Sequence, residues 1–352
     1  MAATTVATTI ISDFTLFASI ATALIVTVFI TPWFIRFFKA IRLVGLDLHK
    51  KKSPVLPTSI GIPVTVGILG GLFLYIAFKT FVVNSLVTEN LTDMLALISS
   101  VMIIAFVGIF DDLNVSRRKV LNIKNGERDT RVGLPQWLKP LLTLPAAIPL
   151  MAVNAGVSTL TIPFLGSFNF GILYPLLLVP IGVIGAANMV NMIGGFNGME
   201  IGMGLVYTLS LGLFALQINN FAAVIFLITF AALLGAWKFN IYPAKMLPGD
   251  SLTYLLGAIV AAGVITGNME KVGIIVMVPF IIEGILKARS GFKATSLGKL
   301  RPDGKLDPPY GRKIYSLTHV VMNLGKFTER QVVLIMILIQ AAFAVIPFLN
   351  II

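Results

Sequence analysis

The stretch "GAANMVNMIGGFNGMEIGMG" (Gly185–Gly204) decides the fold, because it breaks the longest uncharged run of the chain. Residues 140–199 contain no Asp, Glu, Lys or Arg, yet three asparagines (Asn188, Asn191 and Asn197) and a Gly-Gly-Phe-Asn-Gly turn lie in or directly beside this run. A broken helix at membrane depth is tolerated only where protein buries it or where it lines a water-filled cavity. The stretch therefore predicts a cavity wall rather than a lipid-facing helix.

The composition indicates that the membrane is the solvent for most of the protein. The chain is 57% hydrophobic and only 12% charged, with a mean hydropathy of +0.94, whereas a soluble chain is about a quarter charged. The absence of cysteine excludes disulfides, thiolate chemistry and Cys-based metal sites. The first apolar run lacks a preceding basic region, so it is interpreted as an uncleaved span.

Apolar runs of spanning length recur along the whole chain, and a span needs about 20 such residues. They lie at about 14–38, 59–81, 94–110, 140–156, 172–189, 199–216, 220–238, 251–267, 272–288 and 331–351. The sequence therefore predicts an all-α polytopic membrane protein with about ten transmembrane helices, forming one integral membrane domain over residues 1–352. Residues 157–171 predict a small β-hairpin, and the long polar segment 289–330 is rich in turn residues.

The basic residues follow the predicted topology. Of the 27 lysines and arginines, 25 lie in or beside alternate loops, and only Lys79 and Lys271 lie on the other side. The positive-inside rule places these loops in the cytoplasm and both termini outside. Topology thus explains most of the net charge of +12, and no nucleic-acid partner is predicted. The same charge can also attract anionic ligands.

Polar side chains gather at the predicted cytoplasmic face. "VGIFDDLN" brings Asp111 and Asp112 to the end of one span, and "NIYPAKMLPGDSLTYLLGA" brings Asp250 to the start of another. With the asparagine stretch and Lys139 nearby, they are typical of a Mg²⁺ and diphosphate site, because Mg²⁺ takes few carboxylates plus phosphate oxygens and water. The two histidines, His49 and His319, are too far apart in sequence to suggest zinc.

Each of these residues also has a plain structural interpretation. Asp250 can cap a helix N-terminus, and Asp111 with Asp112 can be solvated at the water line. The asparagines can be hydrogen-bonding contacts between helices, and Lys139 can be a cation that snorkels to the interface. Their convergence on one face favours a site.

The motifs "GIFDDLN", "NMVNMIGGFNGMEIG" and "NIYPAKMLPGDSL", in this order, resemble those of the polyprenyl-phosphate N-acetylhexosamine-1-phosphate transferases, which are ten-span membrane enzymes. The likeness covers about Leu46 to Gln340. It is greatest to the archaeal and eukaryotic GlcNAc branch, through "NGMEIGMG" and "KFTERQVVLIMILIQ". "LKPLLTLPAAIPL" is similar to the span that begins with the family's phosphate-binding lysine, which falls on Lys139.

The resemblance implies roles for individual residues. Asp250 and Asn191 would bind Mg²⁺, with Mn²⁺ as an alternative. Asp111 and Asp112, beside the metal, would be catalytic groups together with Asp250. Lys139 would hold phosphate oxygens and Asn197 would read the uracil edge. The further candidates for substrate contacts are Asn188, Glu200, Lys287, Arg289, Lys293, Arg301 and His319.

Two departures concern the donor. The bacterial MurNAc-pentapeptide branch has Asp where this chain has Gly194 and Asn197, and it has a run of three histidines where only His319 stands here. These differences count against a MurNAc-pentapeptide donor. The eukaryotic branch's Arg-His-Arg sugar loop has no clean match.

The activity implied is transfer of GlcNAc-1-phosphate from UDP-GlcNAc to a long-chain polyprenyl (dolichyl) phosphate, with release of UMP, in the cell membrane and with the active site on the cytoplasmic face. The partners would be a UDP-N-acetylhexosamine, the polyprenyl phosphate, the lipid bilayer and, as an open alternative, a second copy of the chain. A transporter is the main rival, but it predicts charges near mid-bilayer. A hydrolase of related substrates and a family member with another donor also stay open.

Overall fold

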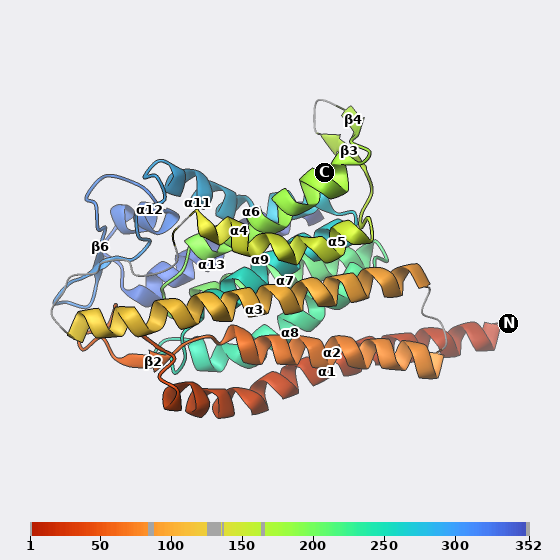
Figure 1. The fold of residues 1–352 in the computed structure, drawn as a ribbon, viewed down its shortest axis with the longest axis horizontal. Helices are drawn as coiled ribbons and strands as arrows, with labels where there is room; N and C mark the ends of the chain where they lie inside the picture. Colours follow the sequence, from red (N-terminus) through yellow and green to blue (C-terminus); the bar gives the residue numbers. More distant parts are fainter. Residues whose placement is uncertain (1, 84–87, 125–134, 136, 163–165, 350–352) are drawn as a thin grey trace.

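The computed structural model describes residues 2–349 except 84–87, 125–134, 136 and 163–165, and regular structure in this part of the chain is overwhelmingly helical (Figure 1). Among these residues, eight helices are long and apolar enough to cross a membrane. They are contained in α1 (Ala2–Ala40), α2 (Gly61–Phe78) with its π-helical extension (Lys79–Val83), α3 (Thr88–Lys124), α6 (Val179–Met192) with a preceding π-helical turn (Tyr174–Leu178), α7 (Met199–Gln217), α8 (Ala222–Asn240), α9 (Gly249–Thr266) and α13 (Glu329–Val345) with a final 3-10 turn (Ile346–Phe348). The prediction of an all-helical polytopic membrane protein is confirmed.

The two other expected spans are divided into short helices. The run 140–156 is formed by α4 (Leu138–Thr143), a 3-10 turn (Leu144–Ala147) and α5 (Ile148–Ala152), and the run 272–288 by α10 (Glu270–Val276) and α11 (Val278–Ala288). Each of these short helices after a break has a proline in its first turn, where the missing N–H is tolerated: Pro145, Pro149 and Pro279. A proline cannot continue the preceding helix, because it lacks the N–H that would bond to that helix. The count of ten spans therefore stays a prediction.

Three short antiparallel hairpins complete the structure. The predicted hairpin at 157–171 is confirmed as β3 (Thr159–Ile162) paired with β4 (Gly166–Asn169). The sequence did not predict the other two, which are β1 (Val44–Leu46) with β2 (Val55–Pro57) and β5 (Lys299–Leu300) with β6 (Leu306–Asp307). A short helix, α12 (Leu317–Leu324), precedes α13.

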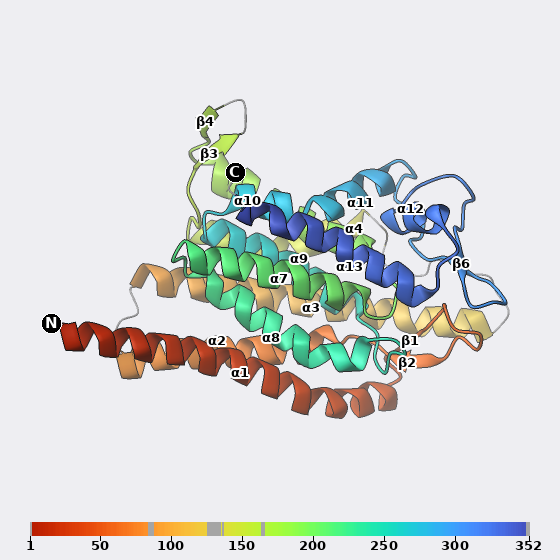
Figure 2. The same ribbon diagram turned by 180° about the vertical axis from the view of Figure 1, so that it is seen from behind.

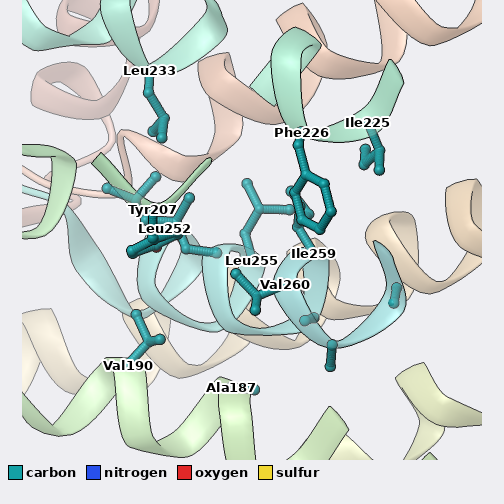
Figure 3. Close-up of a cluster of buried hydrophobic side chains, with 14 of the residues drawn as sticks. Ala187, Val190, Tyr207, Ile225, Phe226, Leu233, Leu252, Leu255, Ile259 and Val260 are labelled. Carbon is teal, nitrogen blue, oxygen red and sulfur yellow. The ribbon is translucent and has the colours of Figure 1, made fainter. Parts of the chain in front are cut away.

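Helix α9 is the centre of the bundle, with 89% of its residues buried. It packs against α2, α3, α6 and α8. Figure 3 shows Leu255 and Ile259 of α9 facing Phe226 of α8, with Tyr207 of α7 beside them. Because neighbours surround α9, the first turn of this helix, which carries Asp250, is held from several sides.

Three helix backbones meet at the start of α9. A Cβ atom added at Gly61 of α2 or at Gly108 of α3 would lie 2.3 or 2.4 Å from backbone atoms of Ser251. No side chain fits in so small a gap, so glycine permits this close approach. Asp112 lies one turn after Gly108 on the same helix, and it is thereby placed beside the first N–H groups of α9.

The two ends of the bundle differ in character. The loop end carries β1–β2, β5–β6 and α12, and the hairpin end carries β3–β4, where α1 also begins and α13 also ends (Figures 1 and 2). The segments that contain the candidate residues from all parts of the chain meet at the loop end.

Candidate active site

Lys139 joins two carboxylates from different helices. Its Nζ lies 2.8 Å from Oδ2 of Asp111 on α3 and 2.9 Å from Oδ2 of Asp250 on α9. The Asp111 side chain is fully buried, whereas 14% of the Lys139 side chain and 23% of the Asp250 side chain remain exposed. The predicted convergence of these segments is therefore present, although 111 positions separate Lys139 from Asp250, and its accessible side is formed by Lys139 and Asp250.

Asp111 has one oxygen engaged and one unpartnered. Its Oδ2 accepts the hydroxyl of Tyr254 at 2.8 Å in addition to the Lys139 contact. Its Oδ1 is buried without a hydrogen-bond partner. A buried carboxylate oxygen without a partner is costly, so this atom is suited to a ligand that supplies positive charge or a proton. Tyr254 was not singled out from the sequence.

Asp112 has a different task from its neighbour. Its Oδ1 accepts the backbone N–H of Asp250 at 2.7 Å, and its Oδ2 accepts the N–H of Ser251 at 3.2 Å and the hydroxyl of Ser59 at 2.6 Å. Asp112 thus caps the N-terminus of α9 from another helix, where a carboxylate is favourable. The capping interpretation that the sequence suggested for Asp250 applies to Asp112 instead.

The asparagines of α6 connect this cluster to neighbouring helices. Asn191 Oδ1 accepts the hydroxyl of Thr253, one turn after Asp250, at 2.8 Å. Asn188 Nδ2 donates to the hydroxyl of Thr143 at 3.0 Å, one turn after Lys139. The amide oxygen of Asn191 is therefore attached to α9 one turn after Asp250, while Asn188 forms an interhelical hydrogen bond that fixes α6 against α4.

The Gly194–Gly198 turn breaks the helix between α6 and α7, and side chains replace the lost backbone bonds. The N–H of Gly195 donates to Oε1 of Glu200 at 2.7 Å, and the N–H of Gly198 donates to Oδ1 of Asn240 at 3.1 Å. Gly195 has φ of +109°, and a Cβ there would lie 2.5 Å from Leu297, so only glycine fits. The turn is packed against protein, with Glu200 and Asn240 supplying these acceptors rather than the three asparagines, and the cavity beside it stays a prediction.

A second polar cluster surrounds Asn197. Its N–H donates to Oε1 of Glu329 at 2.8 Å, and its Nδ2 donates to Oδ2 of Asp47 at 2.8 Å. Lys50 forms ion pairs with both acids. Asp47, Lys50 and Glu329 were not predicted from the sequence, because 150 positions separate Asp47 from Asn197. The "DLHKKK" motif near the start of the predicted resemblance was the available signal.

His49 belongs to the same cluster without forming a zinc site. Its Nε2 accepts the N–H of Gly298 at 3.2 Å, and its ring packs on Phe196 with centroids 4.4 Å apart. It thereby attaches the loop after α11 to the Gly194–Gly198 turn.

The long loop after α11 is held by buried charged groups. Lys287 donates to the carbonyl of Ala294 at 2.9 Å and to the hydroxyl of Ser296 at 2.8 Å. Glu283, fully buried, accepts the N–H of Leu317 at 2.8 Å at the start of α12. The Lys287 side chain, proposed from sequence as a substrate contact, is thus buried and directed at its own loop.

His319 has both ring nitrogens engaged. Its Nδ1 accepts the N–H of Tyr315 at 3.2 Å, and its Nε2 lies 2.9 Å from the carbonyl oxygen of Thr295. Burial, and then the charge of Lys287, lower the pKa of His319 to about 4, so the ring is neutral at pH 7. It stabilises the loop in this conformation.

The remaining basic candidates lie on the outside of the same loop. Arg289 and Lys293 are exposed. Arg301 pairs with Asp303 and Asp307 on its own hairpin, each at 3.3 Å. Their substrate contacts stay predictions, and Arg128 and Arg131 of the basic segment after α3 lie outside the described residues.

The donor set at the first cluster fits Mg²⁺. The described residues contain no group of three His, Cys, Asp or Glu side chains that could hold a metal ion. Mg²⁺, however, uses one or two carboxylates and completes its shell with water and substrate phosphates. The Asp250 carboxylate, the unpartnered Asp111 Oδ1 and the Asn191 amide oxygen are hard ligands of this kind.

Comparison with known proteins gives one family. The model of glycosyl transferase family 4 matches residues 94–268. The chain is 34% identical over 319 residues, covering 90% of each chain, to a candidate UDP-N-acetylglucosamine–dolichyl-phosphate N-acetylglucosaminephosphotransferase of Saccharolobus solfataricus. It is 25% identical to a UDP-N-acetylglucosamine–dolichyl-phosphate N-acetylglucosaminephosphotransferase of Dictyostelium discoideum, covering 87% of this chain and 81% of the relative. It is 27% identical to a phospho-N-acetylmuramoyl-pentapeptide-transferase of Clostridium perfringens, covering 89% and 90%.

Proposed function

The chain belongs to glycosyl transferase family 4, and we propose that it transfers GlcNAc-1-phosphate from UDP-GlcNAc to a dolichyl or related polyprenyl phosphate, with release of UMP. The observation that carries the proposal is the Asp111–Lys139–Asp250 cluster at the loop end of an apolar bundle. The 34% identity to the archaeal relative supports the choice of substrates.

The position of the cluster suits a reaction between a water-soluble donor and a lipid acceptor. Lys139 lies at the start of α4, and Leu141 and Ile148 farther along the same segment are exposed apolar side chains. A polyprenyl chain can remain in the bilayer while its phosphate reaches Lys139. We place the loop end in the cytoplasm of a cell-membrane protein, because the positive-inside rule assigns the basic loops to that side.

The reaction forms one bond and breaks one. An oxygen of the polyprenyl phosphate attacks the phosphorus that carries GlcNAc, and the bond from this phosphorus to the oxygen bridging to uridine phosphate breaks, so that UMP leaves with the electron pair. Lys139 holds phosphate oxygens and reduces their mutual repulsion. Asp111 orients the acceptor phosphate and accepts its proton where one is present. Asp112 keeps Asp250 in place through its backbone.

Mg²⁺, with Mn²⁺ as an alternative, is the cofactor that this donor set fits. Asp250 and Asn191 would hold it beside Asp111. When bound, the ion supplies positive charge that offsets the negative charge of the donor diphosphate.

The geometry around the turn favours the GlcNAc donor over a MurNAc-pentapeptide donor. A Cβ at Gly194 would lie 2.9 Å from Glu200 Oε1, and Asn197 donates to the Asp47 carboxylate. An aspartate at either position, as the resemblance gives for the bacterial branch, would face a like charge. The two departures from that branch are therefore consistent with the surrounding acids of this chain.

The test uses purified full-length protein with radiolabelled UDP-GlcNAc, polyprenyl phosphate and Mg²⁺. We expect label in the lipid phase and stoichiometric UMP, no transfer by Asp250→Asn, and normal transfer by Glu270→Gln, whose carboxylate lies at the hairpin end with Tyr174 as its partner. A hydrolase would release UMP without labelled lipid. Efficient transfer from UDP-MurNAc-pentapeptide in the same assay would overturn the donor assignment.

A further inference from the structure

The ends of α1 and α8 carry five exposed basic side chains, the α1–α8 basic patch. Three lie at the end of α1 and in the turn after it, and two lie at the end of α8 and in the loop after it: Arg36, Lys39, Arg42, Lys238 and Lys245. Helix α1 packs against α8, and the two helix ends lie beside β2 at the loop end (Figures 1 and 2).

Hydrogen bonds at the end of β2 join the two halves of the patch. The N–H of Thr58 donates to the carbonyl of Leu43 at 3.2 Å, and the N–H of Leu247 donates to the carbonyl of Pro57 at 2.8 Å. Because Pro57 and Thr58 are consecutive, the turn after α1 and the loop after α8 are attached to the same point of the hairpin. The five cations therefore belong to one continuous surface.

The protein supplies no counter-charge to this surface. Residues 14–46 and 201–249 contain no Asp or Glu, and among the described residues none of the five cations forms an ion pair. Lys50, Lys139 and Lys287 at the same end of the bundle are different, because they are largely buried and pair with carboxylates of the protein. The positive charge of the patch is therefore uncompensated within the described part of the chain.

Two general effects account for only part of the patch. A helix C-terminus favours a cation in its last turn, which explains Lys39 and Lys238 but not the other three. The positive-inside rule places cations in these loops, but it does not require them to be gathered on one surface without acids. Such a surface at the end of two spans attracts anions from outside the protein.

Aromatic rings indicate the depth of the patch in the bilayer. Trp33 and Phe37 stack with their centroids 5.3 Å apart, and their side chains are 56% and 41% exposed. The spacing of three and four residues puts Arg36 and Phe37 on the same face of α1 as Trp33. Exposed tryptophan at a span end is typical of the membrane interface, at the level of the lipid headgroups, so the cations that follow it are at the depth of lipid phosphates.

We propose that the α1–α8 basic patch binds the headgroups of anionic phospholipids in the leaflet that meets the loop end. Clustered cations beside a span attract an anionic leaflet, and exposed apolar side chains one turn deeper, such as Leu234 before Lys238, are placed to contact the acyl chains. The patch lies on other helices than the Asp111–Lys139–Asp250 cluster of α3, α4 and α9, so the inference does not depend on the proposed function.

The test uses Trp33 as its probe. The chain has three tryptophans, and Trp137→Phe with Trp237→Phe leaves Trp33 alone in the full-length protein. This protein is reconstituted into vesicles that contain phosphatidylcholine and phosphatidylglycerol in a fixed ratio, with bromines, which quench tryptophan fluorescence, on the chains of one lipid or of the other. We expect phosphatidylglycerol to quench Trp33 more strongly, with a relative binding constant of at least about fivefold, which corresponds to the effect of one basic residue near an anionic leaflet.

The patch variant combines Arg36→Gln, Arg42→Gln and Lys245→Gln in the same background. It removes three charges and keeps the two at the helix C-termini. We expect it to lose most of the preference for phosphatidylglycerol. High salt should weaken the preference of the unsubstituted patch, because exposed charges are screened. If quenching by brominated phosphatidylcholine shows that the triple variant does not insert, Arg42→Gln with Lys245→Gln, both outside the helices, takes its place.

The matched control removes the same number of charges from exposed lysines of the long loop at the same end of the bundle: Lys299→Gln, Lys313→Gln and Lys326→Gln. It has the net charge of the patch variant and should keep the preference for phosphatidylglycerol. An equal loss in both variants would assign the effect to net charge and overturn the inference. Equal quenching by the two lipids before any substitution in the patch, or an unchanged preference in the patch variant, would also overturn it. Displacement of phosphatidylglycerol from Trp33 by an equimolar amount of polyprenyl phosphate would assign the patch to the acceptor lipid instead.

Discussion

Replacing each member of the Asp111–Asp112 pair by asparagine should separate a chemical role from a structural one. Asp112 accepts three hydrogen bonds, from Ser59, Asp250 and Ser251. In Asp112→Asn one oxygen becomes NH₂. The arrangement of lowest cost puts this NH₂ group in the place of Oδ2, towards Ser59, whose hydroxyl can rotate to accept a hydrogen bond. The N–H of Ser251, which donates to Oδ2 at 3.2 Å in the wild-type protein, then has no acceptor.

The magnitude follows from these contacts. A hydrogen bond to a charged acceptor contributes about 1.5–3 kcal/mol, and the remaining bonds weaken when the acceptor becomes neutral. We expect Asp112→Asn to lower the free energy of unfolding by about 2–4 kcal/mol and the melting temperature by several degrees. Transfer should also decrease, since the first turn of α9 positions Asp250.

Asp111→Asn should behave in the opposite way. The amide oxygen can take the place of Oδ2 and still accept from Tyr254 and Lys139, while the NH₂ takes the place of the unpartnered Oδ1. Lys139 loses one of its two carboxylate partners but keeps Asp250, so the melting temperature should decrease less than in Asp112→Asn. The turnover number should decrease by roughly 10²–10⁴, the range for the loss of a group that transfers a proton.

The assay combines differential scanning fluorimetry in detergent with turnover of UDP-GlcNAc for wild type and both variants. Ser59→Ala is a graded control, because it removes the hydroxyl bond to Asp112 and leaves both backbone bonds. If Asp112→Asn melts like wild type but loses turnover as Asp111→Asn does, the capping argument is refuted and Asp112 acts on the substrate. Wild-type turnover in Asp111→Asn would remove Asp111 from the mechanism.

Two further predictions concern topology and metal. Single cysteines in place of Lys293 at the loop end and Ser167 of β4 should differ in intact cells, where an impermeant thiol reagent labels only the one at 167. Equal labelling would contradict the charge-based orientation, and the chain has no native cysteine to interfere. Treatment with EDTA should abolish transfer and added Mg²⁺ should restore it, while Asp250→Asn remains inactive at any Mg²⁺ concentration; full transfer in the presence of EDTA would refute a metal site at Asp250.

The members of the first cluster could be predicted from the sequence, because the membrane topology alone places them at the same face of the bundle. Each of Asp111, Lys139 and Asp250 stands at the end of an apolar run, and the alternation of runs puts these ends at one face. Their depth is then set by span length. The separate tasks of Asp111 and Asp112 could not be predicted, because they depend on which helix packs beside them, and that is decided by the small residues Gly61 and Gly108.

The contacts of the second cluster and of the long loop could not be predicted from the sequence, even though the "DLHKKK" motif was an available signal for Asp47 and Lys50. Asp47, Lys50 and Glu329 look like ordinary loop charges in the sequence, and only tertiary packing brings them to Asn197. For Lys287 the difference is the opposite one: the sequence predicted a side chain that is accessible to substrate, and the structure buries it. Lys287 stands in the last turn of α11 beside a basic, polar loop, where a lysine is usually exposed, but its side chain is buried and donates to two acceptors of that loop, with the Glu283 carboxylate 3.6 Å away. Whether a loop charge faces water or its own loop is not encoded locally.

The charge balance of the first cluster explains why Lys139 alone is not enough for the proposed reaction. Two carboxylates and one ammonium leave a formal charge of minus one, and the donor diphosphate and acceptor phosphate would add at least three more negative charges. At an effective dielectric constant near 20, two unit charges 4 Å apart repel by about 4 kcal/mol. The repulsion among these groups therefore exceeds what one lysine can offset. Since the Asp250 carboxylate and the Asn191 amide oxygen are ligands of the kind that hard cations prefer, a divalent ion is the source of positive charge that we propose for this position, and Lys139 holds the two carboxylates together in the absence of that ion.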